Sequence, residues 1–384
     1  MRILFDARVL KTTLTGVETY TVELLRRLAS RAGARVTALC RDARHAELVR
    51  KLTTSDLPVA IARSGMPLRI HHWLRQHGPF DLMHCPTPVF PFLRKPPGLP
   101  LVCTVHDVTP RFAPQWHQRS TVAYFRWILP HLLPLFDHFL ADSRATACDL
   151  SDWYRMDETR ITVVPLASRF STAALTATPA SLAPKQNVFL AVGTIEPRKN
   201  LENTVRGFVE FQRRHPAAGY ALVIVGREGW GLAPWKTIAT GRSDIRFTGY
   251  LADDALQQLY RTARGLVYPS FYEGFGLPVL EAMSLGCPVV TSPVSSLPEV
   301  GGDAVLYADP HDPLAIASSL GRLCHEPEMA DRLAKEGLAR AATFSWDRTA
   351  QETWAAYEHT LARKPPERRS HAGRHRSLPG VATE

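Results

Sequence analysis

One stretch decides the fold: residues 187–200, with the sequence NVFLAVGTIEPRKN. Its apolar run predicts a buried strand that ends at Gly193. Asn200 is a favourable N-cap for a helix that starts at Leu201 and has apolar residues along one face. A strand, a turn and a helix in this order form the repeating unit of a parallel sheet covered by helices.

The same unit recurs on both sides of a linker at 168–186, which is rich in Ala, Ser, Thr and Pro. Further strands are predicted at 2–5, 35–40, 80–84, 101–106, 137–142, 160–164, 221–226, 245–248, 265–268 and 288–291, and a helix at 17–28. The sequence therefore predicts an α/β protein with two doubly wound, Rossmann-like domains that face a cleft, residues 1–170 and 187–345. In such sheets ligands bind beyond the carboxyl ends of the strands, so the cleft is the expected site.

The end of the chain has a different character. A helix at 346–362 is expected to pack back on the first domain, because it follows the second domain and carries Trp354 and Tyr357. Residues 363–384 are basic and nearly free of large apolar side chains, which predicts a disordered tail.

Composition limits the protein class. The chain has 384 residues, of which 45% are hydrophobic and 21% charged, which excludes a disordered protein. No apolar run is long enough to predict a transmembrane helix, the N-terminus does not resemble a secretory signal, and the six cysteines contain no Cys-x-x-Cys pair. A reducing cytoplasm is the expected location.

The net charge is +10, of which +9 lies in residues 1–170, so this half is suited to bind nucleic acid, anionic lipid or a phosphorylated substrate.

The stretch at 268–283, YPSFYEGFGLPVLEAM, is a candidate ligand loop. Its glycines allow a close approach of the backbone to a ligand, and free amides at the start of the following helix suit a phosphate. Glu273 and Glu281 are eight residues apart and can hold hydroxyl groups of one polar ligand, since carboxylates are disfavoured beside a diphosphate. The alternative is a solvated loop glutamate and a glutamate near the helix start that the helix dipole favours.

Arg198 and Lys199 form a second candidate site at the carboxyl end of a strand, beside a helix start. Both features attract phosphate. The two cations can replace a divalent metal at a diphosphate, and Asp253-Asp254 fits a helix start better than a metal site. No metal and no other cofactor is expected.

Together, the two motifs resemble the retaining glycosyltransferases of family four, which have the GT-B fold. The resemblance comprises Glu-x7-Glu (Glu273, Glu281), the pattern G-T-x-E-P-R-K-N at 193–200, and matching segments at 225–231, 247–251 and 298–302. It is looser in the N-terminal half, where Gly16 corresponds to a glycine-rich loop near the donor diphosphate and His106 to a histidine near the donor sugar.

The resemblance implies a role for each matched residue. The implied catalytic residues are His106, Arg198, Lys199 and Glu273; the implied donor-binding residues are Gly16, Gly226, Arg227, Tyr250, Leu251, Ser270, Gly274, Phe275, Gly276, Leu277 and Glu281. The subgroup pattern implies transfer of mannose from GDP-mannose to a glycan or lipid-linked acceptor in surface polysaccharide biosynthesis. The alternatives are a UDP- or dTDP-sugar donor, or a GT-B nucleotide-sugar epimerase.

Residues 119–136 are apolar and aromatic, with Arg119, Arg126 and His131 among them. Relatives bind an acceptor or touch a membrane with this region, whereas the other interpretation is a buried helix broken at Pro130. The expected partners are thus a nucleotide-sugar donor, a saccharide acceptor and an anionic surface at the inner face of the membrane, but no nucleic acid.

Overall fold

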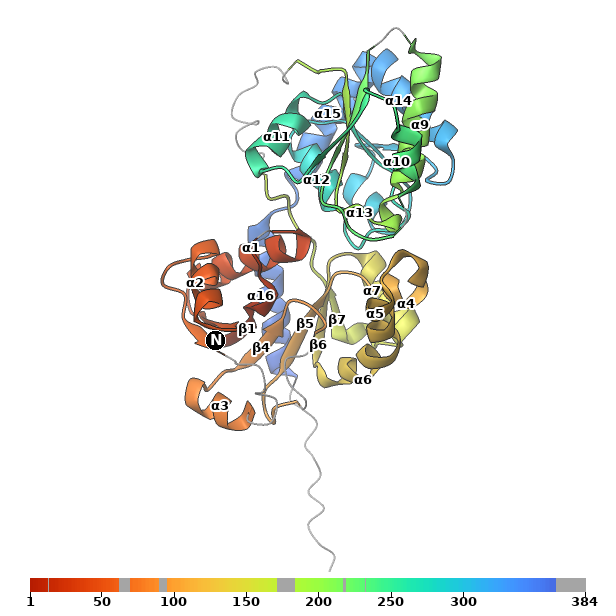
Figure 1. Ribbon diagram of the computed structural model, residues 1–384. Coiled ribbons are helices and arrows are strands. Elements are labelled where there is room, and N and C mark those ends of the chain that lie inside the picture. The colour runs from red at the N-terminus through yellow and green to blue at the C-terminus, as the bar shows by residue number, and fades with distance from the viewer. Residues whose placement is uncertain are drawn as a thin grey trace, which may run out of the picture.

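The computed structural model describes residues 1–12, 14–61, 70–89, 95–170, 184–216, 219–231 and 233–363. They form two lobes, each built on one parallel sheet flanked by helices (Figure 1). The predicted architecture of two doubly wound α/β units is therefore confirmed. Residues 171–183 of the linker and the tail from 364 lie outside the described residues.

The first lobe has a seven-stranded sheet with the order β3-β2-β1-β4-β5-β6-β7. Its strands are β1 Arg2–Asp6, β2 Arg35–Cys40, β3 Val59–Ile61, β4 Leu82–Cys85, β5 Leu101–Val105, β6 His138–Ala141 and β7 Ile161–Val163. Its helices include α1 Gly16–Ser30, α2 Ala43–Leu52, α3 Ile70–His77, α4 Thr109–Phe112, α5 Arg119–Ala123, α6 Leu129–Leu132 and α7 Arg144–Tyr154. The strand order reverses between β1 and β4, which creates a crevice at their carboxyl ends.

The second lobe has a six-stranded sheet with the order β10-β9-β8-β11-β12-β13. Its strands are β8 Val188–Val192, β9 Ala221–Val225, β10 Ile245–Gly249, β11 Gly265–Tyr268, β12 Val289–Thr291 and β13 Leu306–Tyr307. Its helices are α9 Leu201–Arg214, α10 Pro234–Ala239, α11 Asp253–Thr262, α12 Leu277–Ser284, α13 Leu297–Gly301, α14 Pro313–His325 and α15 Pro327–Ala341. Here the order reverses between β8 and β11, the two strands that precede the predicted motifs.

Asn200 corrects one local prediction. It stands before α9, but its side chain makes no capping hydrogen bond to that helix, and its φ of 54° is left-handed. The amide nitrogen instead donates to the carbonyl oxygens of Pro269, at 2.8 Å, and Pro310, at 2.6 Å. Asn200 therefore ties the start of α9 to the beginning of the loop that carries Glu273.

Helix α16, Trp346–Ala362, leaves the second lobe and packs against α1 and β6 of the first (Figure 1). Its Tyr357 is fully buried, and the hydroxyl lies 2.5 Å from His84 Nδ1. His84 Nε2 lies 2.8 Å from Thr104 Oγ1, which in turn lies 2.7 Å from the hydroxyl of Tyr20. Burial lowers the pKa of His84 to about 3, so the ring is neutral and can donate at one nitrogen and accept at the other.

This chain of hydrogen bonds makes the attachment of α16 testable. Tyr357→Phe removes the hydroxyl but keeps the ring, leaving His84 Nδ1 buried without that partner. We expect the free energy of unfolding in urea to fall by about 1–3 kcal/mol, the cost of an unsatisfied buried polar group. Tyr307→Phe is the control: its partly exposed hydroxyl donates to Gly302 O, and its loss should change stability by less than about 0.5 kcal/mol. Equal effects of the two substitutions would contradict the assigned role of Tyr357.

Candidate functional site

A cavity of about 500 Å³ lies between the lobes, at the carboxyl ends of both sheets. Residues from both lobes line it, so it is formed only when the two face each other. The predicted residues in its lining are Gly16, His106, Arg198, Lys199, Gly226, Arg227, Tyr250, Leu251, Glu273, Gly274, Phe275, Gly276, Leu277 and Glu281.

Ser270 is the predicted residue that the lining does not include. Its side chain is completely buried, and its carbonyl oxygen accepts a hydrogen bond from Ser292 at 2.5 Å. The residue lies at the base of the loop, two residues after β11 ends. Ser270 therefore supports the loop rather than facing a ligand.

Glu273 is held between two cations at the centre of the second-lobe side. Its carboxylate accepts hydrogen bonds from Arg198 Nη1 at 2.7 Å and from Lys199 Nζ at 2.8 Å. Burial alone would raise the pKa of Glu273, but the two cations outweigh it and lower the pKa to about 2. The carboxylate is therefore ionised at neutral pH. Arg198 also donates to Glu196, which the sequence motif contains but the site prediction left out.

Glu281 lies in α12 near its start, as expected, and it pairs with a residue that sequence reasoning missed. Arg169 Nε lies 2.9 Å from the Glu281 carboxylate, and the same guanidinium lies 3.0 Å from Asp253. The pKa of Glu281 is raised, because burial outweighs the effect of Arg169. Arg169 was assigned to the linker by composition, and a lone arginine beside Ser168 gives no sequence signal of this role.

Arg227 and Tyr250 form a flat surface at the edge of the cavity. The guanidinium lies over the ring, 5.1 Å from its centre, and Tyr250 is about half exposed. The neighbouring Gly226 has a φ of 152°, and a Cβ there would lie 1.8 Å from the carbonyl oxygen of Gly193. Only glycine permits this close approach between the chain after β8 and the chain after β9.

His106 lies on the first-lobe side of the cavity. Its Nδ1 is 2.6 Å from the carboxylate of Asp142, and its Nε2 is 3.0 Å from the carbonyl oxygen of Pro86. Asp142 also lines the cavity and, like Arg169, was not predicted from the sequence.

The part of the chain that the structure describes contains no group of three or more His, Cys, Asp or Glu side chains arranged to hold a metal ion. Asp253, at the start of α11, pairs with Arg169 as described above. The cavity itself is lined by four cationic side chains, those of Arg169, Arg198, Lys199 and Arg227.

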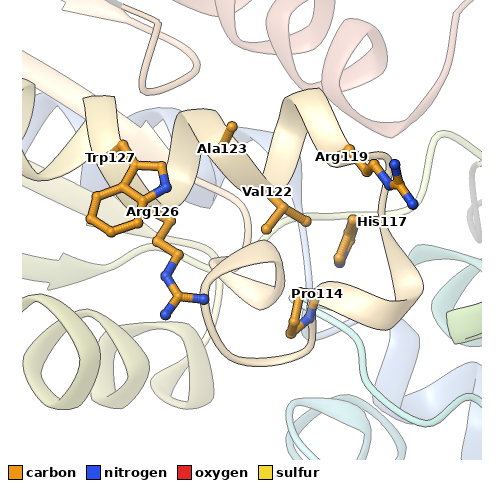
Figure 2. Close-up of a pocket in the computed structure, with 7 residues that line it drawn as sticks. All are labelled: Pro114, His117, Arg119, Val122, Ala123, Arg126 and Trp127. Atoms are coloured by element: carbon orange, nitrogen blue, oxygen red, sulfur yellow. The ribbon is translucent and has the colours of Figure 1, made fainter.

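A second hollow, of about 300 Å³, lies on the first lobe beside the contact between the lobes. Figure 2 shows Pro114, His117 and Val122 around it, with Arg119 at one end and Arg126 and Trp127 at the other. The neighbouring Trp116 stacks on Phe271, and its carbonyl oxygen accepts a hydrogen bond from Trp230 of the second lobe at 2.7 Å.

The helix along this hollow corrects the predicted break at Pro130. The backbone stays helical from Arg119 to Leu135, because a π-helical turn at Tyr124–Ile128 precedes α6 and the Leu129 amide donates to Tyr124 O. This wider turn accommodates a proline that has no amide hydrogen to donate. Buried and exposed faces coexist: Leu129 is fully buried, whereas Trp127 is 67% exposed and Ile128 50%. No helix among the described residues combines the length and apolarity needed to cross a bilayer.

Two family models match the two lobes. The model described as Glycosyltransferase Family 4 matches residues 14–167, and the model described as Glycosyl transferases group 1 matches residues 177–340. Each model thus covers one lobe, and together they account for both sides of the cavity.

Named relatives and solved structures agree with these matches. O-antigen chain mannosyltransferase B of Escherichia coli is 32% identical over 398 residues, covering 93% of this chain and all of the relative. D-inositol 3-phosphate glycosyltransferase of Salinispora tropica is 34% identical over 59% of this chain and 52% of its own. The crystal structure of Anabaena Alr3699/HepE with UDP-glucose has a TM-score of 0.70 at 16% identity, covering 94% of this chain and 99% of its own. WaaG, from lipopolysaccharide biosynthesis, has a TM-score of 0.63 at 16% identity, covering 93% and 98%. At this identity the two structures show a shared GT-B fold.

The buried cluster around Glu273 predicts a stability change that can be measured without any substrate. Glu273→Gln leaves Arg198 and Lys199 without their common carboxylate, so we expect a loss of about 3–5 kcal/mol in the free energy of unfolding at pH 7. Because the folded-state pKa is below the ordinary value, the carboxylate stabilises the wild type above about pH 4.5. That contribution is lost as the pH falls towards 2.

The measurement is urea unfolding of wild type and variant at a series of pH values. The difference between them should shrink steadily below about pH 4.5. Glu336→Gln, which removes an exposed ion pair with Arg332, should cost less than about 1 kcal/mol at pH 7. A difference for Glu273→Gln that stays constant down to pH 3 would contradict the ionised, cation-paired state.

Proposed function

The chain belongs to glycosyltransferase family 4, and on that basis we propose that it transfers mannose from GDP-mannose to a glycan or lipid-linked acceptor. The observation that carries the proposal is the match to O-antigen chain mannosyltransferase B along that relative's whole length. The proposed setting is surface polysaccharide biosynthesis, on the cytoplasmic side of the membrane. As in related enzymes of this family, the anomeric configuration of the sugar would be retained.

The charges in the cavity support a nucleotide-sugar donor. Arg198 and Lys199 stand at the carboxyl end of β8 and would neutralise the diphosphate, whose negative charge grows as the bond to the sugar breaks. When the diphosphate arrives, it competes with Glu273 for these two cations. The Glu273 carboxylate would then be free to accept hydrogen bonds from hydroxyl groups of the donor sugar. Glu281 would accept hydrogen bonds from the hydroxyl groups of the ribose.

The reaction would need no bound metal, because the two buried cations supply the charge that a divalent ion supplies elsewhere. The nucleoside end of the donor would lie against the Arg227–Tyr250 surface, with Gly226 and Leu251 beside it. Gly16, Gly274, Gly276 and the backbone of Phe275 and Leu277 would approach the diphosphate and the sugar.

The acceptor would approach from the first lobe, along the helical segment 119–135. The exposed Trp127 and Ile128 form an apolar tip beside Arg126, and Arg119 adds positive charge at the other end of the hollow. This combination is typical of surfaces that touch anionic membranes. The hollow shown in Figure 2 lies between this tip and the contact with the second lobe, and it would receive the saccharide part of a lipid-linked acceptor.

The donor assignment predicts a clear preference among nucleotides. A site that hydrogen-bonds a base rejects a mismatched base strongly, since buried polar groups are left unpaired. We expect GDP to stabilise the protein against heat more than UDP or dTDP does at equal concentration. At 100 times its dissociation constant, GDP should add roughly 2.7 kcal/mol to the free energy of unfolding of the ligand-free protein. With GDP-mannose, turnover should persist in EDTA, and Arg198→Ala should lower it about 10²–10³-fold.

Each arm of this experiment can fail separately. If UDP or dTDP stabilises the protein more than GDP does, the assignment of GDP-mannose as donor is wrong, while the assignment as a glycosyltransferase is unaffected. If EDTA abolishes turnover and Mn²⁺ or Mg²⁺ restores it, the metal-independent mechanism is wrong. If the donor is consumed at full rate without any acceptor and its sugar is isomerised, the epimerase alternative is correct.

The membrane proposal predicts salt-dependent binding to vesicles. The protein should sediment with anionic liposomes at low salt and be released as salt rises. Arg126→Gln should weaken binding about fivefold, since one basic residue at the surface contributes about 1 kcal/mol, and Trp127→Ala should weaken it at all salt concentrations. Leu314→Ala, an equally exposed apolar residue on α14 of the other lobe, is the control. No binding at low salt would leave a soluble acceptor as the better assignment.

A further inference from the structure

Both ring nitrogens of His106 face oxygen atoms, those of the Pro86 carbonyl and of the Asp142 carboxyl group, whose pKa is raised by burial against the opposing effect of His106. Nε2 lies 3.0 Å from the carbonyl oxygen of Pro86, which has no hydrogen to give. Nδ1 lies 2.6 Å from the carboxylate of Asp142, which is buried to the same degree as a core residue. A neutral imidazole carries one hydrogen and can satisfy only one of these contacts unless the carboxyl group holds the second proton.

The three partners come from three neighbouring strands. Pro86 follows β4, His106 follows β5, and Asp142 follows β6, and these strands are adjacent and parallel. One imidazole ring therefore joins the carboxyl ends of three strands at the edge of the sheet that faces the cavity. A ring with two N–H groups makes this junction complete.

We propose that His106 is held as an imidazolium by Asp142 and the Pro86 carbonyl, and that Asp142 is a positioning residue for the transfer reaction. In this state neither nitrogen has a free lone pair, so His106 does not take the proton of the acceptor hydroxyl. Its cationic ring fixes the strand ends on the first-lobe side of the cavity. This inference rests on the proposed function only where it concerns turnover; the charge state itself can be tested without substrate.

The backbone of His106 also contacts the second lobe. The carbonyl oxygen of His106 faces Gly274 so closely that a Cβ on that glycine would lie 1.8 Å away. Thr146 and Ser143 of α7 and its N-cap donate hydrogen bonds to the Gly274 carbonyl, at 3.2 and 2.7 Å. Because Gly274 follows Glu273, the position of His106 fixes where the Glu273 loop meets the first lobe.

The groups that face the ring favour its charge. Burial opposes protonation, but Asp142, and to a lesser degree Asp107, raise the pKa of His106 above its ordinary value. The Tyr20 ring meets it edge to face with 5.1 Å between ring centres, and His84 lies behind, where the charge of His106 helps to keep it neutral. A charge held by a raised pKa is present below the ordinary pKa of histidine and is lost as pH rises through the folded-state pKa.

Asp142→Asn tests the charge while keeping the shape. An asparagine amide can donate to Nδ1 while Nε2–H still donates to Pro86, so the geometry survives but the ring becomes neutral. In ¹⁵N-histidine-labelled protein at pH 7.5, the His106 signals, assigned by their loss in His106→Gln, should show two protonated nitrogens in the wild type. The Asp142→Asn protein should show one, as His84 does in both.

Kinetics then test the positioning role. With saturating acceptor, Asp142→Asn should lower kcat about tenfold or more with little change in the donor KM. The alkaline limb of its pH profile should move to lower pH by about one unit or more.

A neutral His106 in the wild type would overturn the proposal even if transfer occurs. A protonated His106 with an unchanged pH profile in Asp142→Asn would overturn the positioning role alone. Absence of mannose transfer by the wild type would count against the proposed function and leave the spectroscopic result intact.

Discussion

The buried carboxylate of Glu273, held by Arg198 and Lys199, is the interaction on which the organisation of the second lobe depends. Its members come from two loops, one after β8 and one after β11, and the reversal of strand order places these strands side by side. Asn200 adds a second connection between the same two loops. The cluster therefore keeps two cations in place inside a cavity that would otherwise disfavour them.

The sequence predicts the parts of this molecule that are local in the chain. The pattern of apolar runs located most strands to within two residues, but missed β3 and β13, which have three and two residues and lie at the sheet edges. Most cavity residues were predicted because they belong to short contiguous motifs that match the family, and the isolated Gly16 and His106 were predicted from the looser resemblance of the N-terminal half. Arg169 and Asp142 were not predicted, since each acts through a partner more than 30 residues away in the sequence. The partner of Arg169 is Glu281, and the partner of Asp142 is His106. The sequence around Asn200 fits a helix cap, but it does not show whether the side chain bonds to the helix or to a neighbouring loop. The packing of the loops decides this, and the side chain bonds to Pro269 and Pro310.

Several specific contacts join the lobes. Glu299, on α13, accepts the backbone amides of Arg144 and Ala145 at the start of α7, so the second lobe supplies acceptors for a helix of the first. Gly274 fits against His106 because it has no side chain. The contact between Gly274 and His106 borders the cavity and connects the position of the Glu273 loop to the carboxyl end of β5.

The return of α16 to the first lobe means that the chain passes between the lobes twice. The two passages are bound to each other, since Trp346 Nε1 donates to Ser168 O at 3.1 Å and Thr349 Oγ1 donates to Pro165 O at 2.7 Å. A single crossing segment would leave the lobes free to rotate about it in several directions, whereas two segments that are hydrogen-bonded to each other act as a hinge. Two joined crossings thereby restrict the directions in which the Glu273 side and the His106 side of the cavity can move relative to each other.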